Sequence, residues 1–196
     1  MVIATDDSRI AEVAADFGAE VEMTQQDHPS GTDRVAEVLS RRENSTHAIN
    51  VQGDEPMVSP ELIDSLAAAL TGGSSPAMVS AATPMTEPDL IEDANVVKVV
   101  IGLDGNAIYF SRSPIPYPRS QASARYYRHH GIYGYKRDFL FQFVSWNPSP
   151  LELTEGLEQL RALDHGARIQ MLITDEQAIG VDTPEQAEQV SKLISP

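Results

Sequence analysis

The chain has 196 residues, and its 29 acidic and 14 basic side chains give a formal net charge of −15 at pH 7. This length fits one domain with its own core, and the acidity disfavours a general nucleic-acid binder. The chain has no cysteine, no apolar run of the roughly 20 residues that span a membrane, and no signal-peptide pattern at its start, which favours a cytoplasmic protein without disulfides or thiolate chemistry.

The first half of the chain alternates short apolar runs with helical patterns. Asp7 or Ser8 can cap a helix with apolar residues at 10, 13, 14 and 17, and Gly18 stands where that helix should end. Two further helices are expected after Ser30 and from Ser59-Pro60. Strands are expected at Val2–Ala4, Ala19–Met23 and Ala48–Val51. This βαβ order predicts a parallel sheet covered by helices.

The middle of the chain has a different pattern. Asp104-Gly105 lies between the apolar runs 95–103 and 106–110, which predicts a β-hairpin. Residues 112–128 are rich in Pro and Arg and are expected to form a loop. Gly131–Tyr135 is expected to be a strand, and Asp138–Val144 a short helix.

The last third returns to helix and strand. Ser149, Pro150 and Glu152 combine Pro at the first helical position with a capping box. The helix that follows is expected to turn Leu153, Leu157 and Leu160 to the core and Glu155, Glu158 and Gln159 to the opposite, solvated side. Ile169–Ile173 is expected to be a strand, and Thr183-Pro184 should start the final helix.

Positive charge gathers in one window of this acidic chain. Residues 1–98 carry 18 acids and 5 bases, whereas residues 111–137 carry six bases and no acid. Such a window can receive a small anion, or it can be a solvated loop or a subunit contact.

Two carboxylates stand where strands of an open α/β sheet are expected to deliver ligand-binding groups. Asp54 follows an apolar strand in Gln52-Gly53-Asp54, and Asp182 precedes the last helix. Each can be a capping or helix-dipole acid, and together they could share one Mg²⁺.

Two polar segments could bind a substrate. Ser30-Gly31-Thr32 can offer N–H and O–H donors to an anion or a base edge, or can simply cap its helix. Residues 128–135 combine Arg, His and Tyr, which suit a hydroxylated acid. His129 and His130 should point to opposite faces of their strand, which disfavours a shared metal ion. The alternative role of the tyrosines is in the core or an interface.

Taken together, eight segments resemble the CMP-Kdo synthetases, the 3-deoxy-manno-octulosonate (Kdo) cytidylyltransferases. They are residues 3–7 (IATDD), 28–34 (HPSGTDR), 50–56 (NVQGDEP), 109–112 (YFSR), 128–135 (RHHGIYGY), 149–152 (SPLE), 157–161 (LEQLR) and 180–184 (GVDTP). The resemblance covers essentially the whole chain in the right order.

The resemblance implies a fold and an activity. The fold would be a three-layer α/β/α nucleotidyltransferase domain over residues 1–196, like the nucleotide-diphospho-sugar transferases. Its sheet would be mixed but mostly parallel, with a β-hairpin insert within residues 84–135 that joins two subunits in a homodimer. The activity would be Mg²⁺-dependent transfer of CMP from CTP to Kdo, with release of pyrophosphate, for lipopolysaccharide synthesis. No nucleic acid or membrane would be a partner.

The resemblance also implies roles for individual residues. Asp54 and Asp182 would be the catalytic Mg²⁺ ligands. The residues that bind CTP would be Thr5, Asp6, Ser30, Gly31, Thr32 and Arg34. The residues that bind Kdo would be Gln52, Arg128, His129, Tyr133, Glu158 and Gln159. One or more of Arg112, Arg128 and Arg161 would meet the Kdo carboxylate.

One family element has no counterpart in this sequence. The family begins with a further strand and a phosphate-binding loop rich in Arg, Gly and Lys, and the strand normally lies near the middle of the sheet. Without it, unpaired backbone and apolar helix faces are expected to be exposed. The alternative function is therefore a non-catalytic truncated paralogue or fragment that keeps the dimer and sugar-binding surfaces.

Overall fold

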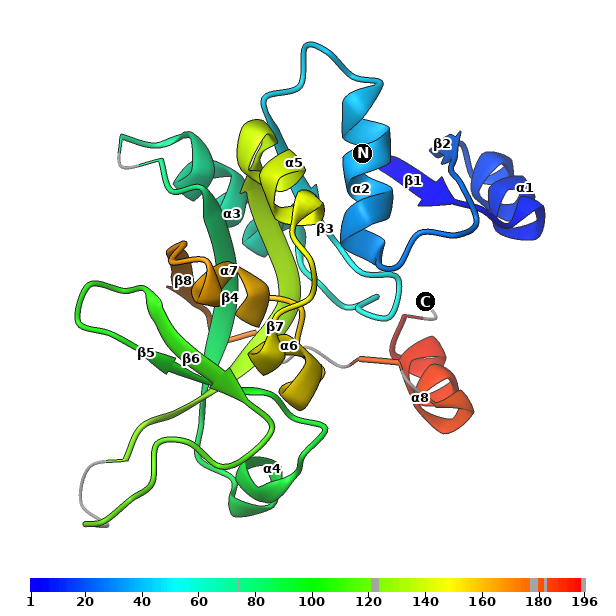
Figure 1. Ribbon diagram of the computed structural model, residues 1–196. Coiled ribbons are helices and arrows are strands. Elements are labelled where there is room, and N and C mark those ends of the chain that lie inside the picture. Colours follow the sequence, from blue (N-terminus) through cyan, green and yellow to red (C-terminus); the bar gives the residue numbers. More distant parts are fainter. Residues whose placement is uncertain (74, 121–123, 177–179, 182, 195–196) are drawn as a thin grey trace.

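The computed structural model describes residues 1–73, 75–120, 124–176, 180–181 and 183–194, apart from the side chains of Gln189 and Ile194. Its strands form two sheets (Figure 1). The smaller sheet pairs β1 (Val2–Thr5) with β2 (Glu20–Met23). The main path of the larger sheet runs β6 (Ala107–Ser111), β5 (Lys98–Ile101), β7 (Tyr126–Lys136), β4 (Met78–Met85) and β8 (Ile169–Ile173), and β3 (His47–Asn50) also pairs with β7.

The sheet is mixed, as expected, but the prediction that it is mostly parallel is wrong for the described strands. Only β1–β2 and β4–β8 pair in parallel there. The long strand β7 is antiparallel to β3, β4 and β5, and β5 is antiparallel to β6. Because β7 runs opposite to its three neighbouring strands, most strand pairs in the larger sheet are antiparallel.

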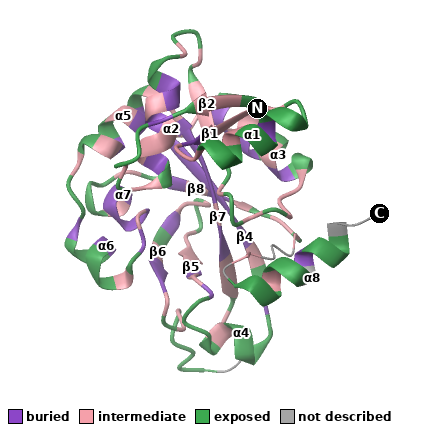
Figure 2. Ribbon diagram, turned by 90° about the vertical axis from the view of Figure 1, so that its right-hand side faces the viewer, coloured by how far each residue is buried: buried purple, intermediate pink, exposed green. Residues whose placement is uncertain are grey.

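Helices cover both faces of the larger sheet. On one face, Leu62, Leu66 and Leu70 of α3 (Pro60–Thr71) pack against Val79 and Ala81 of β4. On the other face, α2 (Gly31–Ser40), α5 (Arg137–Ser145) and α7 (Leu160–Asp164) contribute to the main core. The remaining helices are α1 (Ser8–Asp16), α4 (Pro88–Glu92), α6 (Pro150–Glu155) and α8 (Pro184–Ile194). Layers of helix, sheet and helix therefore enclose β4 and β7, which Figure 2 shows largely buried.

Serine side chains begin three of these helices, as the sequence predicts. Ser30 accepts hydrogen bonds from the N–H groups of Thr32 and Asp33, and Ser59 accepts one from the N–H of Leu62. Ser149 and Glu152 form the expected capping box of α6. Replacing such a cap by Ala typically costs about 1 kcal/mol, so each serine helps to determine where its helix starts.

The β1–β2 sheet stands apart from the larger sheet. No pairing among the described residues links the two, and α2 contacts both β1 and β3 (Figure 1). The apolar face of α1 is open to solvent, since Ile10, Val13 and Phe17 are 53%, 62% and 68% exposed. Figure 2 shows α1 largely exposed.

Two elements differ from expectation at their ends. β7 begins at Tyr126, so the last part of the expected 112–128 loop is strand. The helix expected to run from Pro150 through Leu160 is interrupted, because Gly156 adopts a left-handed conformation with φ +63°.

This interruption corrects the expected helix faces. Leu153 does not face the core and is 71% exposed, whereas Leu157 and Leu160 are buried beyond the break. Glu155, Glu158 and Gln159 do not share a solvated side: Glu155 lies on α6, and the other two lie in the segment that leads into α7. Gln159 is only 4% exposed.

The candidate active site

A cavity of about 300 Å³ lies between the turn after β3, strand β7 and the segment before α7. Among the residues predicted to bind substrate or metal, Asp54, Arg128, His129, Tyr133 and Gln159 line it. The other lining residues are Glu55, Asn95, Val96, Val97, Arg112, Gly131, Leu157 and Gly180. We call this space the site cavity. It brings together residues that are up to 126 positions apart, counted from Asp54 to Gly180.

Several buried polar side chains in and beside the site cavity have atoms without a hydrogen-bond partner among the described residues. Asn50 Nδ2, Glu158 Oε1 and Gln159 Nε2 are buried without a hydrogen-bond partner among the described residues. Most buried polar groups in proteins are hydrogen-bonded, so each of these atoms needs an explanation. Gln159 lines the site cavity, and a polar ligand there would provide the partner that its amide lacks. Asn50 does not line the cavity, but it pairs in the sheet with Tyr133, which does.

The N-terminus of α2 connects the residues predicted for the nucleotide with those predicted for the sugar. Thr32 Oγ1 donates a 2.5 Å hydrogen bond to Glu158 Oε2. Gly31 lies against Gln52, since a Cβ on Gly31 would come within 3.0 Å of Gln52 Oε1. A larger residue than Gly31 would therefore push against the Gln52 side chain. These two contacts join the helix start to the end of β3 and to the segment before α7.

The other predicted nucleotide residues hold one another in place. Arg34 forms an ion pair with Asp6 at 3.2 Å, which ties α2 to the end of β1. Thr5 Oγ1 accepts a 3.1 Å hydrogen bond from the N–H of Asp7, and Ser30 Oγ donates to Asp33 at 2.7 Å. None of these residues is among the described residues that line the site cavity. They position the end of β1 and the start of α2.

The geometry distinguishes between the three arginines considered for a substrate carboxylate. Arg161 forms a buried two-point ion pair with Glu152, with N–O distances of 2.6 and 2.8 Å. The guanidinium of Arg112 donates to the carbonyls of Ala94, Glu155 and Gly156. Arg128 lines the site cavity, and its guanidinium has no hydrogen bond or ion pair within the part of the chain that the structure describes. Arg128 is thus the cation best placed to accept a new anion.

The two adjacent histidines lie on opposite faces of β7, as expected. His129 Nε2 is 3.0 Å from Ser80 Oγ, and His130 Nε2 is 2.6 Å from Thr83 Oγ1. Burial lowers the pKa of His129 to about 3 and, together with the charge of Arg128, lowers the pKa of His130 to about 4. Burial also raises the pKa of Tyr133 well above 10. At neutral pH the site therefore presents neutral rings that can exchange hydrogen bonds with hydroxyl groups.

The lowered pKa values predict that stability falls in mild acid. Both histidines have a pKa near 6.5 in the unfolded chain, but the pKa is about 3 for His129 and about 4 for His130 in the fold, so between these values the unfolded state binds more protons. Each histidine should then remove up to about 1.4 kcal/mol of unfolding free energy per pH unit as pH falls below 6.5. Urea unfolding from pH 7 to pH 5 should show a shallower pH slope in His130→Gln than in the natural chain. Equal slopes would contradict this prediction.

Of the two predicted metal ligands, only Asp54 is among the described residues. Asp54 is exposed, and no hydrogen bond or ion pair reaches its carboxylate from the described residues. Asp182 lies outside the described residues, but the preceding residue, Val181, donates its N–H to the carbonyl of Asp54 at 2.8 Å. No group of three or more His, Asp or Glu side chains suited to a metal occurs in the described part of the chain. Free carboxylate oxygens of this kind do suit Mg²⁺.

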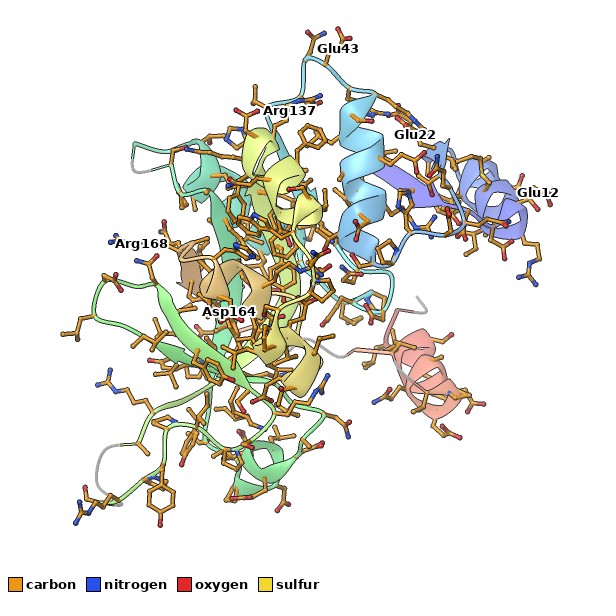
Figure 3. The ribbon with its side chains drawn as sticks, viewed as in Figure 1. Glu12, Glu22, Glu43, Arg137, Asp164 and Arg168 are labelled. Carbon is orange, nitrogen blue, oxygen red and sulfur yellow. The ribbon has the colours of Figure 1, made fainter. Side chains whose placement is uncertain are left out.

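A larger cavity of about 620 Å³ lies elsewhere, at the N-terminal ends of β4 and β8. Trp146, His165 and Arg168 line it, and Figure 3 shows Arg168 near the start of β8. None of the residues predicted for substrate or metal lines it. No helix among the described residues is long and apolar enough to cross a membrane.

Comparison with known proteins connects this geometry to one family. A family profile described as "Cytidylyltransferase" matches residues 1–169. A 3-deoxy-manno-octulosonate cytidylyltransferase of Solibacter usitatus is 48% identical over 193 residues, covering 98% of this chain and 76% of the relative. The enzyme of the same name from Geobacter sulfurreducens is 46% identical over 201 residues, covering 97% of this chain and 80% of the relative.

A solved structure agrees with the sequence comparison. The structure of CMP:2-keto-3-deoxy-manno-octonic acid synthetase complexed with CTP superposes with a TM-score of 0.93 and 38% identity, covering 98% of this chain and 79% of that chain. The α/β fold is therefore that of a nucleotidyltransferase. With the profile, the relatives and the fold in agreement, this chain belongs to the 3-deoxy-manno-octulosonate cytidylyltransferase family.

Proposed function

We propose that this protein transfers the CMP group of CTP to Kdo, giving CMP-Kdo and pyrophosphate for lipopolysaccharide synthesis. The observation that carries the proposal is the Thr32–Glu158 hydrogen bond, because it joins the start of α2 to a segment whose neighbouring residues, Leu157 and Gln159, line the site cavity. The likeness to a relative solved with CTP supports the nucleotide, and the relatives' names support the sugar. Since CTP is an intracellular nucleotide, the proposal places the reaction in the cytoplasm.

The proposed reaction needs placement more than covalent catalysis. The anomeric hydroxyl oxygen of Kdo forms a bond to the α-phosphorus of CTP and its proton passes to solvent. The bond from that phosphorus to the bridging oxygen breaks, and pyrophosphate leaves with the electron pair. Arg128 would bind the Kdo carboxylate. His129 and Tyr133 would bond its hydroxyls, together with Gln52, Glu158 and Gln159. Neutral His and Tyr rings suit this role, since hydroxyls both donate and accept hydrogen bonds.

The nucleotide would lie at the start of α2. We assign CTP to the set Thr5, Asp6, Ser30, Gly31, Thr32 and Arg34. The N–H groups at a helix start favour anionic ligands, and Gly31 leaves its backbone accessible. The Asp6–Arg34 ion pair would keep this surface rigid before the nucleotide arrives.

Asp54 and Asp182 would hold Mg²⁺, which when bound neutralises charge on the phosphates. The free carboxylate of Asp54 fits this role, and the Val181–Asp54 hydrogen bond supports the pairing because Val181 precedes Asp182 in the chain. This bond ties the segment after β8 to the turn after β3.

We further propose that residues 1–196 belong to one nucleotidyltransferase domain. The helices on both faces of the larger sheet and the contacts of α2 with both β1 and β3 support this. We propose a homodimer joined through the β-rich insert, residues 84–135. Exposed apolar side chains there support such a contact, namely Leu103, Ile108 and Tyr117 at 113%, 62% and 86% exposure.

Equilibrium binding tests the substrate assignment. Calorimetric titration in Mg²⁺ should show that CTP binds and that ATP and GTP bind at least about tenfold more weakly, since a base-reading site discriminates through hydrogen bonds. Glu158→Gln should weaken Kdo binding while CTP binding changes less. Equal affinity for CTP and ATP would contradict the proposal.

A further inference from the structure

The backbone of β7 is irregular at the site cavity. Opposite β4, Ser80 pairs with Tyr133, but the next residue, Ala81, pairs with His130. Gly131 and Ile132 are therefore left without partners on β4, which makes a β-bulge between two residues that line the site cavity. A β-bulge changes the direction of the side chains beside it. The contacts that hold this bulge therefore also set the directions of the His129 and Tyr133 side chains.

Ser80 fills the bulge. It is fully buried, and its Oγ lies 2.9 Å from the carbonyl oxygen of Ile132, 3.3 Å from that of His130 and 3.0 Å from His129 Nε2. A carbonyl oxygen has no proton to give, so the single hydroxyl proton of Ser80 must lie toward Ile132 or be shared with the carbonyl of His130. The hydroxyl cannot then donate to His129, and His129 Nε2 has to carry a proton and donate to Ser80.

The protonation of Nε2 also determines the protonation state of the other ring nitrogen, Nδ1. A neutral imidazole carries one N–H, so Nδ1 of His129 is an acceptor. No hydrogen bond of Nδ1 occurs within the described residues, and His129 lines the site cavity. Of the two ring nitrogens, Nδ1 is then the one left to accept a hydrogen bond from a ligand in the cavity.

We propose that Ser80 is a positioning residue that locks His129 as the Nε2–H tautomer, so that Nδ1 accepts a hydrogen bond from a substrate hydroxyl. The ligand role rests on the proposed function, whereas the tautomer does not. This tautomer would make the cavity discriminate between ligands. It would favour a ligand with a hydroxyl at this point over one with a ketone or ether oxygen, because such an oxygen would face a second acceptor.

A pair on the opposite face offers a matched control. Thr83 Oγ1 donates to the carbonyl of Glu176 at 2.8 Å, so His130 Nε2 must donate to Thr83. The same chemistry therefore occurs one residue away, outside the set of residues that line the site cavity. Removing the Thr83 hydroxyl should alter the His130 ring and leave the His129 ring unchanged.

The tautomer is measured directly in the natural chain. A long-range ¹H–¹⁵N correlation spectrum of ¹⁵N-histidine-labelled protein separates the protonated nitrogen of each ring from the unprotonated one, and His129→Gln identifies the His129 signals. We expect His129 to be protonated at Nε2, with Ser80→Ala shifting its signals and Thr83→Val shifting only those of His130. Protonation of His129 at Nδ1 in the natural chain would overturn the proposal, whatever the protein's activity.

Kinetics test the consequence for substrate. Ser80→Ala should raise KM for Kdo by about tenfold with KM for CTP little changed, because the acceptor is no longer held toward the sugar. Ser80→Thr, which keeps the hydroxyl, should restore most of the loss. Ser145→Ala removes a serine hydroxyl that bonds only the Gln142 carbonyl on α5 and should have no effect. An equal rise in both KM values, or no rescue by Thr, would show a structural role only and overturn positioning.

The proposed tautomer and the proposed function can be contradicted independently. If the natural chain shows the Nε2–H tautomer but neither binds nor converts Kdo, the proposed function fails and the Ser80–His129 lock stands. If Kdo is converted but His129 carries its proton on Nδ1, the lock fails and the function stands.

Discussion

Replacing Asp54 with Asn is expected to lower kcat/KM for CTP by about a thousandfold, equal to about 4 kcal/mol of transition-state stabilisation. The amide keeps the size of the carboxylate but removes the negative charge that a hard cation needs. Asp54 lines the site cavity, and no side-chain bond with the described residues competes for it. The Mg²⁺ concentration for half-maximal rate should rise in parallel.

Asp64→Asn is the matched control for this substitution. Asp64 is an exposed residue on α3 outside the set that lines the site cavity, so the same change of charge there should leave the rate and the Mg²⁺ requirement unchanged. If Asp54→Asn retained turnover within about threefold of the natural chain, Asp54 would not be a metal ligand.

The second large effect concerns stability. Glu152→Ala is expected to lower the unfolding free energy by about 3–5 kcal/mol, because it removes the close countercharge of the buried Arg161 guanidinium and leaves only Glu158, at 3.9 Å, among the described residues. The side chains of Glu152 and Arg161 are only 11% and 8% exposed, and Glu152 also closes the capping box with the N–H of Ser149. Urea unfolding followed by circular dichroism would measure the loss.

Two further variants separate the buried charge from the loss of a glutamate as such. Glu20→Ala breaks an ion pair with Arg42 in which the glutamate is 58% exposed, and such pairs contribute only about 0–1 kcal/mol. The double variant Glu152→Leu with Arg161→Met removes both charges and should recover most of the stability. A double variant as unstable as Glu152→Ala would show that packing or capping, not the stranded charge, explains the loss.

Local chemistry made much of the fold predictable from sequence. The caps Ser30, Ser59 and Ser149 act within three residues of themselves, and Gly105 at φ +77° makes the Asp104-Gly105 hairpin turn. Such short-range signals do not depend on what packs around them.

The central strand β4 was not predicted because its sequence carries little local signal. The middle of β4 reads Ser80-Ala81-Ala82, small residues without the branched or aromatic side chains that favour strands. Burial between two helix layers selects small residues there, and that is a tertiary effect. The interruption at Gly156 was missed for a similar reason, since Leu153, Leu157 and Leu160 keep helical spacing across it.

Several residues that line the site cavity could be predicted from the sequence, but the contacts between residues around it could not. The family resemblance pointed to His129, Tyr133 and Gln159, which the structure brings to one cavity. No pattern in the sequence indicated that Thr32 reaches Glu158, or that Ser80 lies in the bulge behind His129. These pairs are 126 and 49 positions apart, so only the folded sheet reveals them.

The measurement that tests the central claim most directly is pyrophosphate release by the purified 196-residue protein with CTP, Kdo and Mg²⁺. We expect release that requires all three, with little or none when ATP or GTP replaces CTP or when sialic acid replaces Kdo. Folded protein that binds CTP but releases no pyrophosphate with Kdo would contradict the proposed cytidylyl transfer and favour a non-catalytic sugar-binding role.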